Sequence, residues 1–311
     1  MPILSVIIPA YNEGVNVSTC AQTLIELLAP LDITFELIFV DDGSIDDTWY
    51  AIENITTTNH AVKGVKLSKN FGKEGAIMAG LVNAEGQVCG IIDCDLQHPP
   101  KTFIEMYHVW ANGNVDIVDG VKKSRGKESA LYKSLSRLFY FSIESFGGII
   151  LQNSSDLKLL DRRVVDILIN LPEKQRFFRA LSSWVGFTTV NVPFEVEPRL
   201  IGHSKFSYVK SFKYAVTNIT SFTSAPLQII TIMGIIFFIA SVVLGITTLY
   251  NWIVFRAVEG FTTVILLLLI IGSMLMIALG VIGIYISKIY EEIKNRPTFI
   301  IDKMVYQNKI Q

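Results

Sequence analysis

The most distinctive chemical pattern in this chain is a short run of two carboxylates and an amide, Asp93-Cys-Asp-Leu-Gln97. Carboxylate and amide oxygens are ligands that Mg²⁺ and Mn²⁺ prefer in proteins. Two carboxylates spaced two residues apart converge on one cation where the chain turns at the end of a strand. A cation with so few protein ligands keeps positions for substrate phosphate oxygens. The run therefore predicts a metal site made of Asp93, Asp95 and Gln97, and we expect His98 to cap a helix or face solvent.

The first 120 residues have the pattern of a scaffold for such a site. Short β-branched runs alternate with helical patterns, which predicts strands over 4–8, 35–40, 62–67, 88–92 and 116–118 and helices over 16–28, 47–57, 74–84 and 99–112. This alternation indicates a parallel sheet covered on both faces. Ligands of such sheets bind at the carboxyl ends of the strands. Because Asp41, Asp42, Asp93 and Asp95 all follow strands, we expect them in one cleft.

Two long uncharged segments set the C-terminal part of the chain apart. The chain has 311 residues, and 50% of them are hydrophobic, but between residues 226 and 286 only Arg256 and Glu259 are charged. Residues 229–250 and 262–286 are each long enough to span a bilayer. Lysines before the first segment and after the second place both outer ends on the cytoplasmic side by the positive-inside rule. The pattern predicts a two-helix transmembrane hairpin with the soluble part in the cytoplasm.

Charge and cysteine content exclude several classes of protein. The net charge of −1 argues against a nucleic-acid-binding surface. The three cysteines lack the spacing of a zinc site or a disulfide framework, which favours a reducing compartment. Residues 121–225 are less regular, with helices expected over 128–146, 161–170 and 175–185 and a strand over 188–196. Residues 206–222, with Lys210 and Lys213 among aromatic side chains, are typical of a helix at the membrane interface.

Several ordered motifs resemble the family 2 glycosyltransferases of the GT-A fold. They are Val6-Ile-Ile-Pro-Ala-Tyr-Asn-Glu13, Val40-Asp-Asp-Gly-Ser-Ile-Asp46, Lys69-Asn-Phe-Gly-Lys-Glu74 and Asp93-Cys-Asp-Leu-Gln-His-Pro-Pro100, with Arg199-x-x-Gly-x-Ser-Lys205 further on. More narrowly, the chain resembles the polyprenyl-phosphate sugar transferases, the dolichol-phosphate mannose synthases and the bactoprenol glucosyltransferases, over essentially its whole length. The resemblance implies an α/β fold with a Rossmann-like, mostly parallel sheet. It divides the chain into a GT-A domain (1–205), an interfacial region (206–225), the hairpin (226–287) and a cytoplasmic tail (288–311).

The resemblance also implies roles for single residues. The nucleotide-sugar site would consist of Pro9, Tyr11, Glu13, Asp41 and Asp42, with Arg199 and Lys205 on a loop that closes over the diphosphate. Contact with anionic lipid headgroups is the alternative role for Lys205. Asp156 is the catalytic candidate, although Ser155 and Lys158 stand where the family usually has Gly and Arg. Arg125 matches an arginine that would meet the acceptor phosphate.

The expected reaction is inverting transfer of a sugar from a nucleotide-sugar, most simply UDP-glucose, to undecaprenyl or another polyprenyl phosphate. The product would be a β-linked lipid-phosphate sugar for the cell envelope, and Mg²⁺ or Mn²⁺ would be the cofactor. Because the second pKa of a phosphate monoester is about 6, the acceptor is largely ionised at neutral pH and needs no strong general base. A multi-pass location in the cell membrane follows, without a nucleic-acid partner. A homo-oligomer, a downstream flippase and a second glycosyltransferase are compatible with this function.

Three alternatives remain open at this point. GDP-mannose, UDP-GlcNAc or an amino-arabinose nucleotide could replace UDP-glucose as the donor. A processive polysaccharide synthase is disfavoured because Gln175-Arg-Phe-Phe-Arg179 lacks the Trp of the Gln-x-x-Arg-Trp motif of those enzymes, and two spans cannot form a channel within one chain. A non-catalytic scaffold or flippase partner is disfavoured because Asp93, Asp95 and Gln97 are intact.

Overall fold

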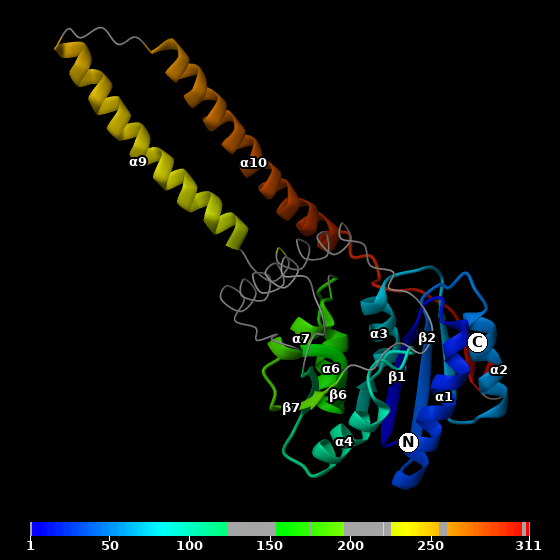
Figure 1. Cartoon of the computed structure of the whole chain (residues 1–311). Helices are drawn as coiled ribbons and strands as arrows, with labels where there is room; N and C mark the ends of the chain where they lie inside the picture. The colour runs from blue at the N-terminus through cyan, green and yellow to red at the C-terminus, as the bar shows by residue number, and fades with distance from the viewer. Residues whose placement is uncertain are drawn as a thin grey trace. The chain divides into compact units, whose positions relative to one another are not determined.

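The computed structural model describes residues 2–123, 154–174, 176–195, 220, 225–254, 260–306 and 309–310. These residues form two compact units (Figure 1). The first unit contains a sheet with helices on both of its faces, and it includes the C-terminal residues from Pro297 onward. The second unit contains two long apolar helices.

A nine-stranded sheet in the order β7-β5-β6-β4-β1-β2-β3-β8-β9 organises the first unit. The strands are β1 (Leu4–Ala10), β2 (Phe35–Asp41), β3 (Val62–Leu67), β4 (Val88–Ile91), β5 (Ile117–Lys122), β6 (Ser154–Asp161), β7 (Thr189–Phe194), β8 (Ile301–Tyr306) and β9 (Lys309–Ile310). Strands β4, β1, β2 and β3 are parallel neighbours, whereas β6 is antiparallel to both β4 and β5. The predicted mostly parallel core is therefore confirmed, with antiparallel additions on both sides.

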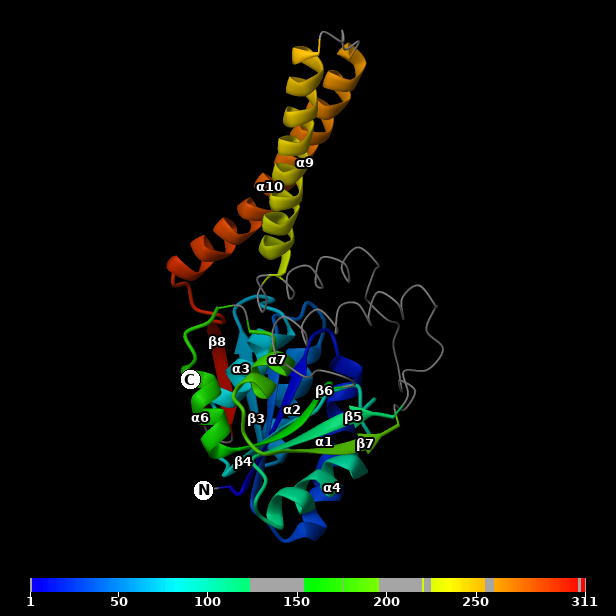
Figure 2. The ribbon, with the colours of Figure 1, turned by 90° about the vertical axis from the view of Figure 1, so that its left-hand side faces the viewer.

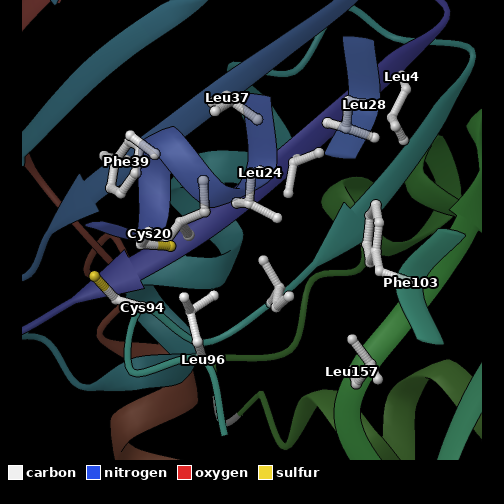
Figure 3. Packing of buried hydrophobic residues seen from close by; sticks show 14 of the residues in the cluster. Leu4, Cys20, Leu24, Leu28, Leu37, Phe39, Cys94, Leu96, Phe103 and Leu157 are labelled. Carbon is white, nitrogen blue, oxygen red and sulfur yellow. The ribbon is translucent and has the colours of Figure 1, made fainter. Parts of the chain in front are cut away.

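Helices cover both faces of this sheet, as Figure 2 shows. They are α1 (Gly14–Leu28), α2 (Thr48–Thr58), α3 (Lys73–Val82), α4 (Pro100–Ala111), α6 (Arg162–Asn170) and α7 (Phe178–Trp184), with a short 3₁₀ turn η1 (Ala29–Leu31) after α1. Leu24 of α1 and Phe103 of α4 pack with Leu37 and Phe39 of β2 in one core (Figure 3). Helix α3 lies on the other face, where Gly80 approaches Ile7 of β1 so closely that a Cβ would overlap it.

Three strands, β6, β8 and the two-residue β9, lie where the sequence pattern did not predict them. Strand β6 begins at Ser154 and carries three charged side chains, so it lacks the apolar run of a buried strand. Strand β8 pairs antiparallel with β3, and its residues belong to the segment 288–311 that was expected to be a tail. The predicted helix after Asp161 is confirmed as α6, and the Asp161 carboxylate caps it by accepting a hydrogen bond from the Arg163 amide at 3.0 Å.

The second unit consists of α9 (Ala225–Ile253) and α10 (Phe261–Ile293), which contact each other. Pro226–Asn251 and Leu267–Ile293 are long and apolar enough to cross a membrane, and their most apolar windows are not buried within the chain. Exposed apolar helices of this length are unlike the core helices of a soluble domain. The interfacial helix expected over 206–225 and the helix expected over 128–146 lie almost entirely outside the described residues.

Candidate active site

The register of the two central antiparallel strands brings two carboxylates together. Ile91 of β4 is the partner of Lys158 of β6, and continuing that register by two residues places Asp93 opposite Asp156. The pairing of β6 with β5 is irregular in the same stretch, between Asp119 and Val121. Irregular pairing of this kind often re-aims a side chain next to an active site. Like charges on facing strand positions repel each other, so this pair requires a cation.

Lys73 provides that cation from the first position of α3. Its Nζ lies 2.6 Å from Oδ1 of Asp93 and 2.7 Å from Oδ2 of Asp156. Arg179 of α7 adds a second cation: its Nε is 2.6 Å from Oδ1 of Asp156, and its Nη2 is 2.8 Å from Oδ2. Two carboxylates and two cations thus form a continuous ion-pair network. Within it, Arg179 and Asp156 form a bidentate ion pair, which is a strong interaction between arginine and a carboxylate.

The network keeps both of its carboxylates ionised. Burial by itself raises the pKa of Asp156, but the charges of Arg179 and Lys73 hold it well below its ordinary value. Burial likewise raises the pKa of Asp93, and Lys73 brings it below the ordinary range. The pKa of Lys73 lies above its usual value, because Asp156 and Asp93 outweigh the effect of burial. A carboxylate this acidic accepts hydrogen bonds readily but removes protons poorly.

Asp42 fixes the start of α3 and therefore the position of Lys73. Its Oδ1 accepts a hydrogen bond from the Phe71 amide at 2.7 Å, and its Oδ2 accepts one from the Gly72 amide at 2.9 Å. Burial raises the pKa of Asp42 to about 6 despite these bonds. Gly43 follows with a φ of +66°, where its α-carbon packs directly on the Lys69 backbone. The Asp-Asp-Gly motif thus connects the end of β2 to the loop before α3.

The Asp93–Gln97 loop is anchored by its apolar members. The side chains of Cys94 and Leu96 are buried and point into the core beside Cys20 of α1 (Figure 3), whereas Asp93, Asp95 and Gln97 are half-buried. Leu96 has a φ of +52°, and the Gln97 amide donates to Oδ1 of Asp95 at 3.2 Å. Alternation of apolar and polar side chains in this turn leaves three oxygen-bearing groups away from the core.

This donor set fits Mg²⁺ or Mn²⁺ better than a softer metal, because it offers two carboxylates and one amide oxygen. No group of three His, Cys, Asp or Glu side chains suited to a metal occurs among the described residues, so a bound cation would need Gln97 or substrate oxygens. His98 differs from expectation. It is buried, its ring lies edge-on to Phe194, and its Nδ1 is 3.8 Å from Oδ2 of Asp93.

The residues expected to bind the nucleotide lie on β1, β2 and the loops that follow them. Pro9 is the penultimate residue of β1, and Tyr11 comes directly after this strand, with 38% of its surface exposed. Glu13 accepts a hydrogen bond from Nδ2 of Asn16 at 2.6 Å. Asp41 is fully buried, and its Oδ1 accepts a hydrogen bond from the Ser44 amide at 2.9 Å. Its Oδ2 has no hydrogen-bond partner within the described part of the chain.

Glu74 holds the two cation-bearing helices together. It directly follows Lys73 on α3, and its Oε2 accepts a hydrogen bond at 2.9 Å from the amide of Phe178, the first residue of α7. Arg179 is the next residue of α7. Burial and the nearby Asp156 charge raise the pKa of Glu74 to about 8, so Glu74 is mostly protonated at neutral pH. It therefore positions Arg179 without adding a third full negative charge to the network.

Replacement of Glu74 by Gln is expected to stabilise the protein increasingly as the pH rises. The pKa of Glu74 is about 8 in the folded chain and near 4.5 when unfolded, so the folded state keeps a proton that the unfolded state releases between these values. The wild-type free energy of unfolding therefore falls as the pH rises from about 4.5 to about 8, because of Glu74. Gln does not titrate, so the variant lacks this loss of stability. Thermal unfolding at pH 5, 6, 7 and 8 should show a melting-temperature advantage for Glu74→Gln that grows to several degrees. An advantage that shrinks with pH would contradict the assignment.

Two members of the ion-pair network had no assigned role in the sequence. Lys73 lies in the motif Lys69–Glu74 that resembles the family, whereas Arg179 lies in the segment 175–179 that departs from the synthase motif, and in both cases the distance along the chain from Asp156 hides the contact. A signal was present at Lys73, because a cation at the first position of a helix opposes the helix dipole and suggests a tertiary partner. Three expected site residues, Arg125, Arg199 and Lys205, lie outside the described residues.

Comparison with known proteins identifies the family of the chain. The profile of glycosyl transferase family 2 matches residues 5–166, which include all of β1 except its first residue, the strands β2 to β6, and both Asp93 and Asp156. The chain belongs to glycosyltransferase family 2. This glycosyltransferase therefore has the GT-A fold, a Rossmann-like sheet with mostly parallel strands, followed here by two apolar helices.

Relatives of this glycosyltransferase match it over nearly its full length. An uncharacterized glycosyltransferase of Synechocystis is 37% identical over 97% of this chain and 95% of its own. A prophage-derived bactoprenol glucosyl transferase of Shigella flexneri is 32% identical over 96% of this chain and 97% of its own. Among solved structures, glucosyl-3-phosphoglycerate synthase from Mycobacterium tuberculosis is 21% identical, with a TM-score of 0.46 over 69% of this chain and 76% of its own.

Proposed function

We propose that this glycosyltransferase transfers a hexose, with glucose from UDP-glucose as the first choice, to a polyprenyl phosphate in the membrane. The observation that carries the proposal is the Asp93–Lys73–Asp156–Arg179 network in a chain that is similar, helices included, to a bactoprenol glucosyl transferase. The network supplies cations beside the loop expected to hold a metal, which suits a reaction between two anionic substrates. The apolar helices suit an acceptor that is itself a membrane lipid.

The low pKa of Asp156 fits a phosphate acceptor. A sugar hydroxyl would need a base to remove its proton, and a carboxylate held ionised by Arg179 and Lys73 is a weak base. A phosphate monoester has a second pKa of about 6 and is already a nucleophile at neutral pH. Asp156 would then act by orienting the two cations around the reacting groups and by stabilising positive charge on the sugar, with no proton transfer.

The proposed reaction is a single displacement. An oxygen of the acceptor phosphate forms a bond to the anomeric carbon, and the bond from that carbon to the donor diphosphate breaks. The nucleoside diphosphate leaves with the electron pair, and the anomeric centre inverts to give a β-linked product from an α-linked donor. Asp93, Asp95 and Gln97 would hold Mg²⁺ or Mn²⁺, which supplies charge stabilisation for the leaving diphosphate. Asp41, Asp42, Pro9, Tyr11 and Glu13 would hold the nucleotide, and Arg125, Arg199 and Lys205 would meet phosphates.

A donor screen tests this proposal. The purified full chain, in nanodiscs with undecaprenyl phosphate and Mn²⁺, is incubated with UDP-glucose, UDP-GlcNAc, GDP-mannose or a UDP-linked amino-arabinose. We expect release of the nucleoside diphosphate that depends on undecaprenyl phosphate and is fastest with UDP-glucose. A different preferred donor would change the sugar assignment only. Turnover that ignores undecaprenyl phosphate, or a lipid-independent polymer, would overturn the acceptor assignment.

We further propose that α9 and α10 cross the membrane as a hairpin and that the catalytic unit lies in the cytoplasm. The lysines outside the two spans support this orientation. Glu259→Cys, in the segment between the spans, should react with a membrane-impermeant maleimide added to intact cells. Asn54→Cys, on the exposed side of α2, should react only after lysis. The native cysteines are buried and should give little background. Labelling of Asn54→Cys in intact cells would reverse the assignment.

A further inference from the structure

The two cations of the network lie nearer to solvent than the carboxylate that holds them. The side chains of Lys73 and Arg179 are 39% and 28% exposed, whereas that of Asp156 is only 9% exposed. A ligand that enters from solvent would therefore meet an ammonium and a guanidinium before it reached Asp156. These are the two groups with which proteins bind phosphate, Lys as a point charge and Arg as a fork of donors.

The structure fixes these two cations from several sides. Asp156 makes one contact with Lys73 and two with Arg179, and Asp93 makes a further contact with Lys73; all four distances are 2.6–2.8 Å. Glu74 ties the start of α7 to the start of α3. Such preorganisation lowers the entropy cost of binding an anion. A surface pair of flexible cations would lack these supports.

The order of the strands indicates which phosphate these cations receive. The residues expected to bind the nucleotide lie at the ends of β1 and β2 and in the loops that follow them, and the Asp93 loop follows β4. Asp156 lies on β6, the next strand beyond β4 in the sheet. Along the edge of the sheet where β1, β2 and β4 end, the expected order is therefore the nucleotide beside β1 and β2, the diphosphate beside β4, and Lys73 and Arg179 beside β6. The position beside β6 is left for the second substrate, the acceptor.

The charge balance supports the same position. In the network two cations face two carboxylates, so its net charge is zero. Glu74 adds little charge at neutral pH, because burial raises its pKa to about 8. If Asp93 held a divalent cation, Lys73 would keep a single carboxylate partner, Asp156. The group of Lys73, Arg179 and Asp156 would then have a net positive charge, which would favour an incoming phosphate dianion.

We propose that Lys73 and Arg179, aligned by Asp156, bind the phosphate group of the acceptor. The inference rests on the proposed function for the identity of that acceptor, a prenyl monophosphate. We call Lys73, Arg179 and Asp156 the phosphate clamp. Lys73 and Arg179 contact the phosphate, and Asp156 holds these two side chains in place. The acceptor oxygen that attacks the sugar lies beside these cations, next to the Asp93 loop that is expected to hold the leaving diphosphate.

Binding measurements on full-chain variants test the clamp. Lys73→Met and Arg179→Gln remove one cation each, and Lys73→Arg and Arg179→Lys retain it. Lys101→Met, on the exposed side of α4, is the matched control. The affinity for farnesyl phosphate is measured by calorimetry with UDP and Mn²⁺ present, and the affinity for UDP is measured separately. We expect farnesyl phosphate to bind at least tenfold more weakly to Lys73→Met and Arg179→Gln, with partial recovery in the retained-charge variants and UDP affinity within about twofold of wild type.

The outcomes separate this inference from the proposed function. Unchanged farnesyl phosphate affinity in Lys73→Met and Arg179→Gln would overturn the clamp, even if the wild type glycosylates undecaprenyl phosphate. A parallel loss of UDP affinity would also overturn it, because the cations would then serve the donor. Loss of farnesyl phosphate binding in these variants, with a wild type that does not use undecaprenyl phosphate, would support the clamp and reject the proposed function. If either charge-removing variant fails to fold, Lys73→Arg and Arg179→Lys are tested in its place. We expect their affinity for farnesyl phosphate to fall by a smaller but measurable factor.

Discussion

Replacement of Asp156 by Asn is expected to slow sugar transfer by about 100- to 1,000-fold, and by the same factor at every pH from 7 to 9. Asn keeps the size of the side chain but loses the charge that aligns Lys73 and Arg179. Because the acceptor phosphate is largely ionised above about pH 6, a rising pH does not replace the missing group. Initial rates with UDP-glucose and undecaprenyl phosphate, measured across this range, give the result.

The control for this prediction is Asp166→Asn, which removes an exposed carboxylate of α6 that pairs with Arg162. It should transfer sugar at the wild-type rate. Thermal unfolding should accompany the rates, because removing one partner of a buried ion pair can cost about 3–5 kcal/mol of stability. A folded Asp156→Asn whose defect fades steadily as the pH rises would identify Asp156 as a general base. Near-normal turnover would remove Asp156 from the mechanism.

Asp95→Asn is expected to abolish transfer and the nucleotide-dependent binding of Mn²⁺ together. The loop should keep its shape, since Cys94 and Leu96 anchor it in the core on either side of Asp95. Loss of one carboxylate from a set with only two leaves a divalent cation with too few charged oxygen ligands. Electron paramagnetic resonance of Mn²⁺, titrated with and without UDP, measures binding independently of turnover.

Glu105→Gln is the matched control for the metal prediction, because it removes an exposed carboxylate from α4, the helix that follows the same loop. It should bind Mn²⁺ and transfer sugar as the wild type does. Two results would contradict the metal assignment. One is full activity of the wild type in excess chelator. The other is an unchanged Mn²⁺ titration in Asp95→Asn with UDP present.

The first part of the fold could be predicted because its signals are local. The apolar runs that became β1 to β4 and the helical patterns between them determine a parallel core without information from distant residues. Strand β6 could not be predicted in this way. Its Lys158 is fully buried and forms an ion pair with Asp119 of β5, in which Nζ lies 2.7 Å from Oδ2. That compensation exists only after the strands have paired. The pairing of β8 with β3 depends in the same way on tertiary contact.

The residues of the candidate site likewise divide into those that local sequence predicts and those that only tertiary contact defines. The rule that ligands bind at the carboxyl ends of parallel strands was enough to select Asp41, Asp42 and the Asp93 loop. Lys73 and Arg179 could not be selected, because each is defined by its contact with Asp156. The antiparallel register of β4 and β6 creates that contact, and no local pattern encodes it. The sequence predicts that His98 caps a helix or faces solvent, whereas packing against Phe194 buries it.

The central claim is that an oxygen of the acceptor phosphate attacks the anomeric carbon of the donor sugar. The most direct test uses undecaprenyl phosphate with its terminal phosphate oxygens labelled with ¹⁸O, turned over by the full chain with UDP-glucose and Mn²⁺. Mass spectrometry should find a lipid that has gained one hexosyl group and no phosphorus and has kept all of its ¹⁸O, with unlabelled UDP released. A lipid diphosphate sugar with release of UMP, or ¹⁸O in the released nucleotide, would contradict the claim.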